Sequence, residues 1–266
     1  MDLQLTGKRA LITGGSRGIG LQVARSLVVE GADVAIAARD PRRLAEAAAQ
    51  LAALAGGRVV TAQLDTGEDE SVSAAVERVQ RELGGIDILV NCAAEPNGSA
   101  ARIVPSQTTD QQFWDAVNVK TVGYLRTVRA VAPGMVSRGW GRIINVSGLA
   151  ARSAGDFVAT ARNVGVAALS KNLADELGPL GVNVTVVHPG MTVTERTEAT
   201  VARIAERSGS TVEEVGARMA AGTSIGRLVT AEEVAWVITF LASPRSIAMT
   251  GDPVVVSGGS PGPIHY

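Results

Sequence analysis

The sequence predicts a three-layer α/β fold, a doubly wound parallel sheet of about seven strands with helices on both faces. Two observations predict this fold. Short apolar runs without a polar face alternate with longer Ala- and Leu-rich stretches of helical period, and such strands are typical of parallel sheets covered on both sides. A Gly-rich turn also joins the first apolar run directly to the first helical stretch.

Each element can be placed in chain order from this alternation. The strands are expected at residues 9–13, 33–37, 59–62, 86–91, 142–146, 183–187 and 253–256. The helices between them are expected at residues 21–29, 42–54, 71–83, 111–136, 164–177 and 231–241. No linker rich in Pro, Gly or Ser and no repeat divides the chain, so we expect a single domain over residues 1–266.

One late segment, residues 195–222, breaks the alternation because it is polar and helical. In a doubly wound sheet, a segment at this place would lie beyond the carboxyl ends of the strands. We therefore expect it to form a lid over a bound ligand.

Composition excludes several classes of function. Hydrophobic residues make up 46% of the 266 residues, ample for one core, and the formal net charge of -1 offers no basic surface for nucleic acid. The only cysteine, Cys92, excludes an internal disulfide and favours a reducing compartment. Neither a leader pattern nor an apolar run near about 18 residues is present. The sequence predicts a cytoplasmic protein that binds a small molecule, with no nucleic acid, membrane or metal partner.

The Gly-rich turn reads T-G-G-S-R-G-I-G over residues 13–20, and a helical stretch follows at once. Glycines permit a tight turn and let backbone N–H groups approach a pyrophosphate, whose charge the helix N-terminus also favours. A strand–helix junction can use glycine for its geometry alone. The position at the first strand of an alternating chain nevertheless favours dinucleotide binding and a Rossmann-type fold.

The spacing of this turn resembles that of the short-chain dehydrogenase/reductase family, and further segments match in order. They are Leu64-Asp65, Asn91-Cys92-Ala93-Ala94, Asn118, and Pro189-Gly190 with Thr192 and Thr194 behind it. The resemblance implies a nicotinamide dinucleotide cofactor, and a homotetramer or homodimer. It places the cofactor on Gly14, Ser16, Arg17, Gly18, Ile19, Gly20, Arg39, Leu64, Asp65, Asn91, Ala93, Pro189, Gly190, Thr192 and Thr194.

The end of the second strand predicts which dinucleotide is bound. An acid there would accept hydrogen bonds from the ribose of NAD, but Ala38 stands at that place and Arg39 follows. Together with Arg17, Arg39 could clamp a 2′-phosphate through charge-assisted hydrogen bonds, which favours NADP(H). Arg39 could instead merely begin a surface helix that Asp40 caps, and a register shift of two would let Asp40 serve the ribose.

The catalytic residues implied by the resemblance are missing. Aligned on the family, Gly148, Ala159 and Asn163 occupy the positions of its catalytic serine, tyrosine and lysine. A register error cannot hide the tyrosine and lysine, because the chain has two tyrosines and three lysines and no tyrosine precedes a lysine by four residues. The nearby Lys171 is too far along the helix from position 163 to substitute.

Other side chains could compensate in part. Ser147 could orient a carbonyl or simply close a strand, and Asn118 would shape the site without supplying a proton. Arg162 is expected at the surface or an interface. His188 at a strand end and Cys92 beside the nicotinamide pocket are expected to be structural. Near the C-terminus, His265 and Tyr266 could reach a neighbouring subunit, where Tyr266 would supply a phenol.

Without a positioned acid, reduction of an isolated ketone should be slow, because such an acid contributes about 10²–10⁴-fold in rate. Quinones, conjugated enones and iminium ions can accept hydride without one. The sequence predicts an NADP(H)-dependent oxidoreductase acting on such an acceptor. The alternative is a catalytically inactive protein that binds NADP(H) as a sensor, scaffold or oligomer subunit, and a lyase or isomerase on the same fold also stays open.

Overall fold

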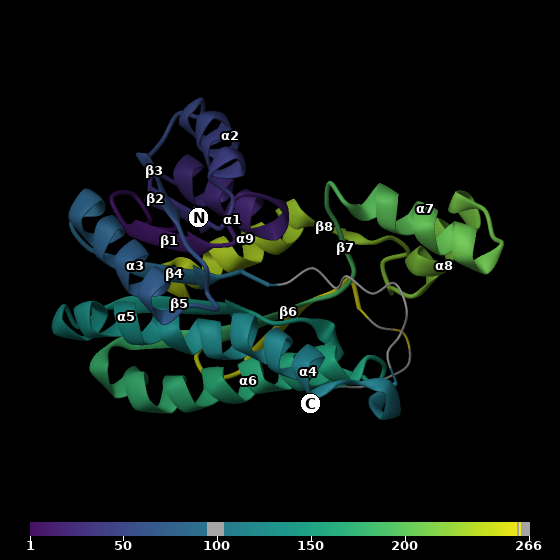
Figure 1. Ribbon diagram of the computed structural model, residues 1–266. Helices are drawn as coiled ribbons and strands as arrows, with labels where there is room; N and C mark the ends of the chain where they lie inside the picture. Colours follow the sequence, from purple (N-terminus) through teal and green to yellow (C-terminus); the bar gives the residue numbers. More distant parts are fainter. Residues whose placement is uncertain (95–103, 260, 262–266) are drawn as a thin grey trace.

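The computed structural model describes residues 1–94, 104–259 and 261. Its main sheet has seven strands in the order β3-β2-β1-β4-β5-β6-β9, all paired in parallel (Figure 1). The strands are β1 Arg9–Thr13, β2 Asp33–Ala38, β3 Val59–Gln63, β4 Ile88–Asn91, β5 Gly141–Val146, β6 Val182–Pro189 and β9 Pro253–Val256. The predicted fold class is confirmed, and each predicted strand lies within three residues of an observed one.

Helices cover both faces of this sheet. They are α1 Gly18–Val29, α2 Pro41–Ala52, α3 Asp69–Leu83, α4 Asp110–Val117, α5 Gly123–Ser137, α6 Phe157–Leu177 and α9 Ala231–Ala242. Short 3-10 turns lie at Pro105–Gln107, Leu149–Arg152, Gly178–Leu180 and Pro244–Ser246.

The core has two layers because successive side chains of a strand point to opposite faces. In β1, Ala10 and Ile12 pack with residues of α1, α2 and α9, whereas Leu11 packs with residues of α3, α5 and α6. The strand order reverses between β1 and β4. In a doubly wound sheet this reversal opens a crevice at the carboxyl ends of the strands, which is where ligands bind.

The predicted helix over residues 111–136 is interrupted. A π-turn, Asn118–Val122, separates α4 from α5, and the Gly123 N–H donates to the Asn118 carbonyl five residues earlier. The prediction of one helix was wrong because the apolar period on either side does not reveal one additional residue in the hydrogen-bond ladder.

The segment between β6 and α9 contains two more helices, α7 Thr197–Ser208 and α8 Val212–Ala221. They pack on each other around a small apolar cluster of Val201, Ala205 and Val215, and Figure 1 shows them beside the main body. The two-residue strands β7 Thr192–Val193 and β8 Val229–Thr230 pair before and after these helices. Within the described part of the chain, no helix is long and apolar enough to cross a membrane.

Candidate functional site

A cleft of about 340 Å³ lies at the crevice where the strand order reverses. Many residues predicted to bind a cofactor line it together: Gly14, Ser16, Arg17, Gly18, Ile19, Gly20, Arg39, Leu64, Asp65, Ala93 and Thr194. These residues come from the turn after β1, the ends of β2, β3 and β4, and the segment after β7. The fold thus brings distant motifs of the sequence to one wall.

The Gly-rich turn fits only residues without a side chain at two places. Gly14 has a φ of +69°, and a Cβ there would lie 2.9 Å from the Cα of Ala93. A Cβ on Gly20 would press against the carbonyl group of Gly14, 2.9 Å from its carbon. The close approach of these segments therefore depends on glycine, as it does where a backbone must approach a phosphate.

The N-terminus of α1 is uncapped and opens on the cleft. Arg17 is the N-cap residue, no side chain caps the helix, and its first turn contains no acidic residue. The first N–H groups of a helix have no intrahelical partners, and the helix dipole favours negative charge there. Because Arg17, Gly18 and Ile19 line the cleft, these N–H groups are available to a bound phosphate.

Four guanidinium groups line the same cleft, from Arg17, Arg39, Arg43 and Arg196. Burial lowers the pKa of Arg17, and the nearby charges of Arg196 and Arg43 lower it further. Of these arginines, only Arg17 and Arg39 were expected at the site from the sequence. Arg43 lies in the first turn of α2 and Arg196 just before α7, so only the course of the chain reveals their proximity.

Asp40 has a structural task at this end of the cleft. Its Oδ1 accepts hydrogen bonds from the N–H groups of Arg42 at 3.0 Å and Arg43 at 3.3 Å, and so caps α2. It also lies 3.4 Å from the Nε of Arg43. Asp40 therefore caps α2, which is one of the two roles that the sequence allowed for it.

Four predicted cofactor residues, Asn91, Pro189, Gly190 and Thr192, do not line the cleft. The Asn91 side chain is fully buried, accepts from Thr127 Oγ1 at 2.8 Å and donates to Asn145 at 3.0 Å. The Gly190 N–H donates to a carbonyl of β9, and Thr192 Oγ1 donates to the Gly190 carbonyl. These residues hold the strand ends in place behind the cleft.

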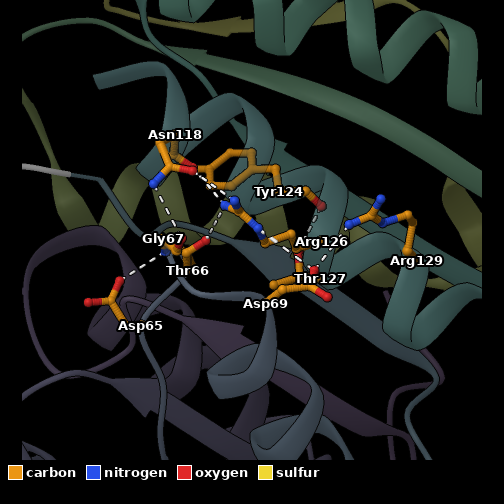
Figure 2. A network of polar contacts seen from close by, with 9 residues as sticks. All are labelled: Asp65, Thr66, Gly67, Asp69, Asn118, Tyr124, Arg126, Thr127 and Arg129. Atoms are coloured by element: carbon orange, nitrogen blue, oxygen red, sulfur yellow. Dashed lines mark hydrogen bonds and ion pairs between the residues drawn. The ribbon is translucent and has the colours of Figure 1, made fainter. Parts of the chain in front are cut away.

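Asn118 is held by protein groups at both ends of its amide (Figure 2). Its Oδ1 accepts from Arg126 Nη2 at 2.8 Å, and its Nδ2 donates to the Gly67 carbonyl at 3.2 Å. Arg126 Nη1 also donates to the Thr66 carbonyl at 3.0 Å, and the Gly67 N–H donates to Asp65 Oδ1 at 2.9 Å. Asn118 therefore fixes the π-turn to the loop after β3, which includes the cleft residues Asp65 and Thr66.

Ser147 is also engaged by the protein. It is 7% exposed, and its Oγ donates to the main-chain carbonyl of Asn163 at 2.9 Å, which ties the end of β5 to α6. Ala159 is buried in the first turn of α6, where its N–H donates to the N-cap Asp156. A Cβ on Gly148 would lie 3.1 Å from Asn163 Nδ2, so a side chain at 148 would crowd this amide.

Lys120 also belongs to this site, although the sequence did not predict it. This side chain is 4% exposed, and its Nζ donates at 2.8 Å both to the Ser147 carbonyl and to Asn163 Oδ1. Burial lowers its pKa to about 7, and the charge of Arg162 adds to the effect. The signal in the sequence was a lysine placed between apolar residues of a predicted helix, two positions after Asn118.

Apart from Lys120, whose Nζ donates to the Ser147 carbonyl and Asn163, the titratable groups Cys92 and His188 do not offer a neutral-pH acid. Burial raises the pKa of the Cys92 thiol, at the cleft wall, to about 12. Burial, together with the charges of Arg152 and Lys120, lowers the pKa of His188 to about 4, and its Nδ1 has no partner among the described residues. Arg162 is 7% exposed, so its expected place at the surface was wrong: the residue lies on the inner face of α6. His265 and Tyr266 lie outside the described residues.

The described residues contain no cluster of three or more His, Cys, Asp or Glu side chains that could hold a metal ion.

Comparisons with known proteins agree with this geometry. The sequence profile of the family described as short chain dehydrogenase matches residues 8–205. The chain is 38% identical to the short-chain reductase protein NovJ of Streptomyces niveus, over 95% of this chain and 93% of that protein. It is 34% identical to the 3-oxoacyl-acyl-carrier-protein reductase FabG of Pseudomonas aeruginosa, over 97% and 98%.

A solved structure has the same architecture. L-Sorbose reductase from Gluconobacter frateurii, complexed with NADPH and L-sorbose, superimposes with a TM-score of 0.91 at 31% identity and covers 98% of each chain. Since the family profile and relatives above 30% identity both span most of the sequence, this chain is a member of the short-chain dehydrogenase/reductase family of oxidoreductases.

Proposed function

We propose that this protein is an NADP(H)-dependent oxidoreductase that transfers hydride to a small acceptor able to delocalise charge, such as a quinone, an enone or an iminium ion. The observation that carries the cofactor part is the cleft itself. It combines a helix N-terminus without a side-chain cap, two glycines that admit no Cβ, and four guanidinium groups. Helix N–H groups bind phosphate, and guanidinium groups bind a further phosphate through paired hydrogen bonds.

The residues that would hold NADP(H) follow from their places on the cleft wall. Gly18 and Ile19 at the start of α1 would hold the pyrophosphate. Arg17, Arg39, Arg43 and Arg196 would surround the 2′-phosphate. A relative of known structure supports this preference, because L-sorbose reductase is complexed with NADPH. The α7–α8 segment, which carries Arg196 at its start, would form the lid expected from the sequence.

The acceptor class follows from the missing acid. A reduced nicotinamide supplies hydride, but an isolated ketone then needs a proton for its oxygen. The aligned position of the family's tyrosine holds Ala159, and the nearby Ser147 hydroxyl donates within the protein. Cys92 and His188 have pKa values far from neutrality, about 12 and about 4. An acceptor that spreads the new negative charge, or already carries a positive one, avoids this requirement.

The acceptor prediction is tested by steady-state assays with NADPH and four acceptors: a quinone, a conjugated enone, a cyclic iminium ion and a simple ketone. We expect turnover of at least one of the first three and about 10²-fold less with the ketone, the loss typical for a missing general acid. Turnover of the simple ketone alone would overturn the acceptor class.

The cofactor prediction is tested separately by binding. Arg17→Ala and Arg196→Ala should each weaken NADPH binding about 10- to 100-fold, because a charge-assisted hydrogen bond contributes roughly 1.5–3 kcal/mol, and NADH binding should change little. Arg207→Ala is the matched control, since Arg207 lies exposed in the last turn of α7. Equal losses for NADPH and NADH would contradict a 2′-phosphate site.

A second function fits the same cleft: NADP(H) binding without catalysis, as a sensor, scaffold or oligomer subunit. The observation that favours it is the combination of Gly148, Ala159 and Asn163 at the aligned catalytic positions. Tight NADPH binding with no oxidation by any of the four acceptors would support it. The homotetramer or homodimer and the cytoplasmic location also stay predictions.

A further inference from the structure

We propose that the Asn163 amide is a hydrogen-bond donor to the acceptor oxygen and that Lys120 is the positioning residue that orients and polarises it. This inference deepens the proposed function and rests on it. Together Lys120 and Asn163 would stabilise the negative charge that develops on oxygen when hydride reaches the acceptor, without a tyrosine.

The first argument is the place of Lys120 in the fold. It lies on the π-turn directly after Val119, and its Nζ donates to the carbonyl of Ser147, directly after Val146. Val119 and Val146 both line the cleft. The ammonium group is therefore enclosed immediately behind the inner wall of the cleft rather than at the surface.

The second argument is the surroundings of this charge. Within the described residues, Lys120 forms no ion pair, and its acceptors are the Ser147 carbonyl and Asn163 Oδ1. The titratable groups that interact electrostatically with it are Cys92, Arg162 and His188, none of them a carboxylate. A buried charge without a counter-ion is costly, and perturbed groups of this kind cluster where a charge acts on a ligand.

The third argument is the orientation of Asn163. With Oδ1 accepting from Lys120, its Nδ2 has no hydrogen-bond partner among the described residues. A Cβ on Gly148 would lie 3.1 Å from Nδ2, so the glycine keeps a side chain at 148 from crowding this donor. Lys120 withdraws electron density from the amide oxygen, which strengthens the N–H donor at the other end. A preorganised donor of this kind stabilises an oxyanion.

The reaction step follows from these contacts. Hydride from the bound reduced nicotinamide would form a new C–H bond at the β-carbon of an enone, or a new O–H bond at one carbonyl oxygen of a quinone, and the nicotinamide would be left oxidised. The π electron pair moves along the conjugated system to the remaining carbonyl oxygen, which becomes an enolate for the enone or a phenolate for the quinone and accepts a hydrogen bond from Asn163 Nδ2. Lys120 keeps its proton throughout, and water protonates the product after release.

The activity test uses full-length variants and the best acceptor of the panel. Asn163→Ala should lower kcat about 100-fold, and Lys120→Met about tenfold, with KM for NADPH unchanged. Because the ammonium form is lost as pH rises, wild-type kcat should fall above about pH 7, and the Lys120→Met profile should show no such step. Lys171→Met is the control, since this exposed lysine pairs with Asp175 on the outer side of α6. A wild-type step that persists in Lys120→Met would overturn the role of Lys120.

A second readout does not depend on turnover. The chain has three lysines, so NMR of protein labelled at lysine Cε gives three resonances, and the one missing in Lys120→Met belongs to Lys120. We expect it to titrate near neutrality in the NADP⁺-bound protein, and its pKa to rise when 4-nitrophenolate, a delocalised oxyanion, binds. In Asn163→Ala this rise should disappear. Binding of the phenolate without any change in the Lys120 titration would overturn the inference.

The two readouts separate the proposals. Absence of turnover with all acceptors would contradict the proposed oxidoreductase, while a phenolate-linked shift of Lys120 would still support the oxyanion site. Turnover without that shift, and with Asn163→Ala as active as wild type, would leave the oxidoreductase standing and remove the role of Asn163.

Discussion

Replacing Gly20 by alanine tests the tight approach between α1 and the Gly-rich turn. A Cβ at this position would lie 2.9 Å from the carbonyl carbon of Gly14 and 3.2 Å from the Cα of Gly15, and closest to the Gly14 oxygen. These are backbone atoms, so they cannot rotate away as a side chain would. Alanine gains about 1 kcal/mol over glycine in a helix, but crowding in a packed region costs about 1–3 kcal/mol or more. Because the contacts are with backbone atoms, we expect a cost near the upper end and a net loss of up to about 2 kcal/mol.

This loss can be measured by urea unfolding followed by circular dichroism, and should lower Tm by about 2–4 °C for each kcal/mol. Gly216→Ala is the matched control, because Gly216 also lies inside a helix, α8, and a Cβ there would meet nothing within 4 Å. The control should be more stable than wild type by up to about 1 kcal/mol. If both variants shifted in the same direction by the same amount, the steric argument for Gly20 would be refuted. NADPH binding should weaken in Gly20→Ala alone, since Gly14 and Gly20 line the cleft.

Two further predictions concern buried charges. Burial lowers the folded-state pKa of Lys120 to about 7 from its ordinary 10.5, so wild-type stability should rise with pH across that window. Lys120→Met lacks this effect. Between about pH 7 and about pH 9, the free energy of unfolding of wild type should therefore rise by about 2 kcal/mol relative to that of Lys120→Met, as measured by urea unfolding. A difference between the two proteins that stays constant over this pH range would contradict the lowered pKa. Asp87→Asn should cost about 1–3 kcal/mol by the same assay, because Asp87 lies 2.6 Å from Arg9 Nη2 and 3.3 Å from Arg138 Nε. In wild type, the hydrogen bonds and charge of Arg9 outweigh burial and lower the pKa of the Asp87 carboxyl group. The stability that this carboxylate contributes should therefore be present above about pH 4 and be lost as pH falls. If Asp87→Asn lost the same free energy of unfolding at pH 3 as at pH 7, this reasoning would be wrong.

Most of the sheet could be predicted because each strand is a local apolar run. The bounds of β1, Arg9–Thr13, and β9, Pro253–Val256, match the prediction. The strands β7 and β8 were missed because two-residue strands leave no alternation to detect. The π-turn at Asn118–Val122 was missed because it adds a single residue to a long helical pattern.

In the candidate site, too, the residues that are adjacent in sequence could be predicted, and those that folding brings together could not. The Gly-rich turn could be found because its residues are adjacent in sequence, and six of its eight residues line one cleft. Arg43, Arg196 and Lys120 could not, since only tertiary folding brings them to it or behind it. Arg162 was expected at the surface or an interface because neighbours on a helix point about 100° apart and position 163 was taken to face the site, whereas Arg162 is 7% exposed. Polar contacts buried between helices leave no periodic signal.

The helix that contains the π-turn can lose one residue there without losing its register. A π-turn uses about one residue more per turn than an α-helix, so removing one residue from Asn118–Val122 would let α4 run into α5 as one regular helix. Because the π-turn absorbs its additional residue, the helix beyond the deletion would keep nearly the same side toward the core, and Tyr124, Val128 and Val131, all at most 2% exposed, would stay buried. The loss would fall on the turn itself, where Lys120 donates to Asn163 and Asn118 accepts from Arg126. A one-residue deletion in the turn should therefore disturb the site more than the fold.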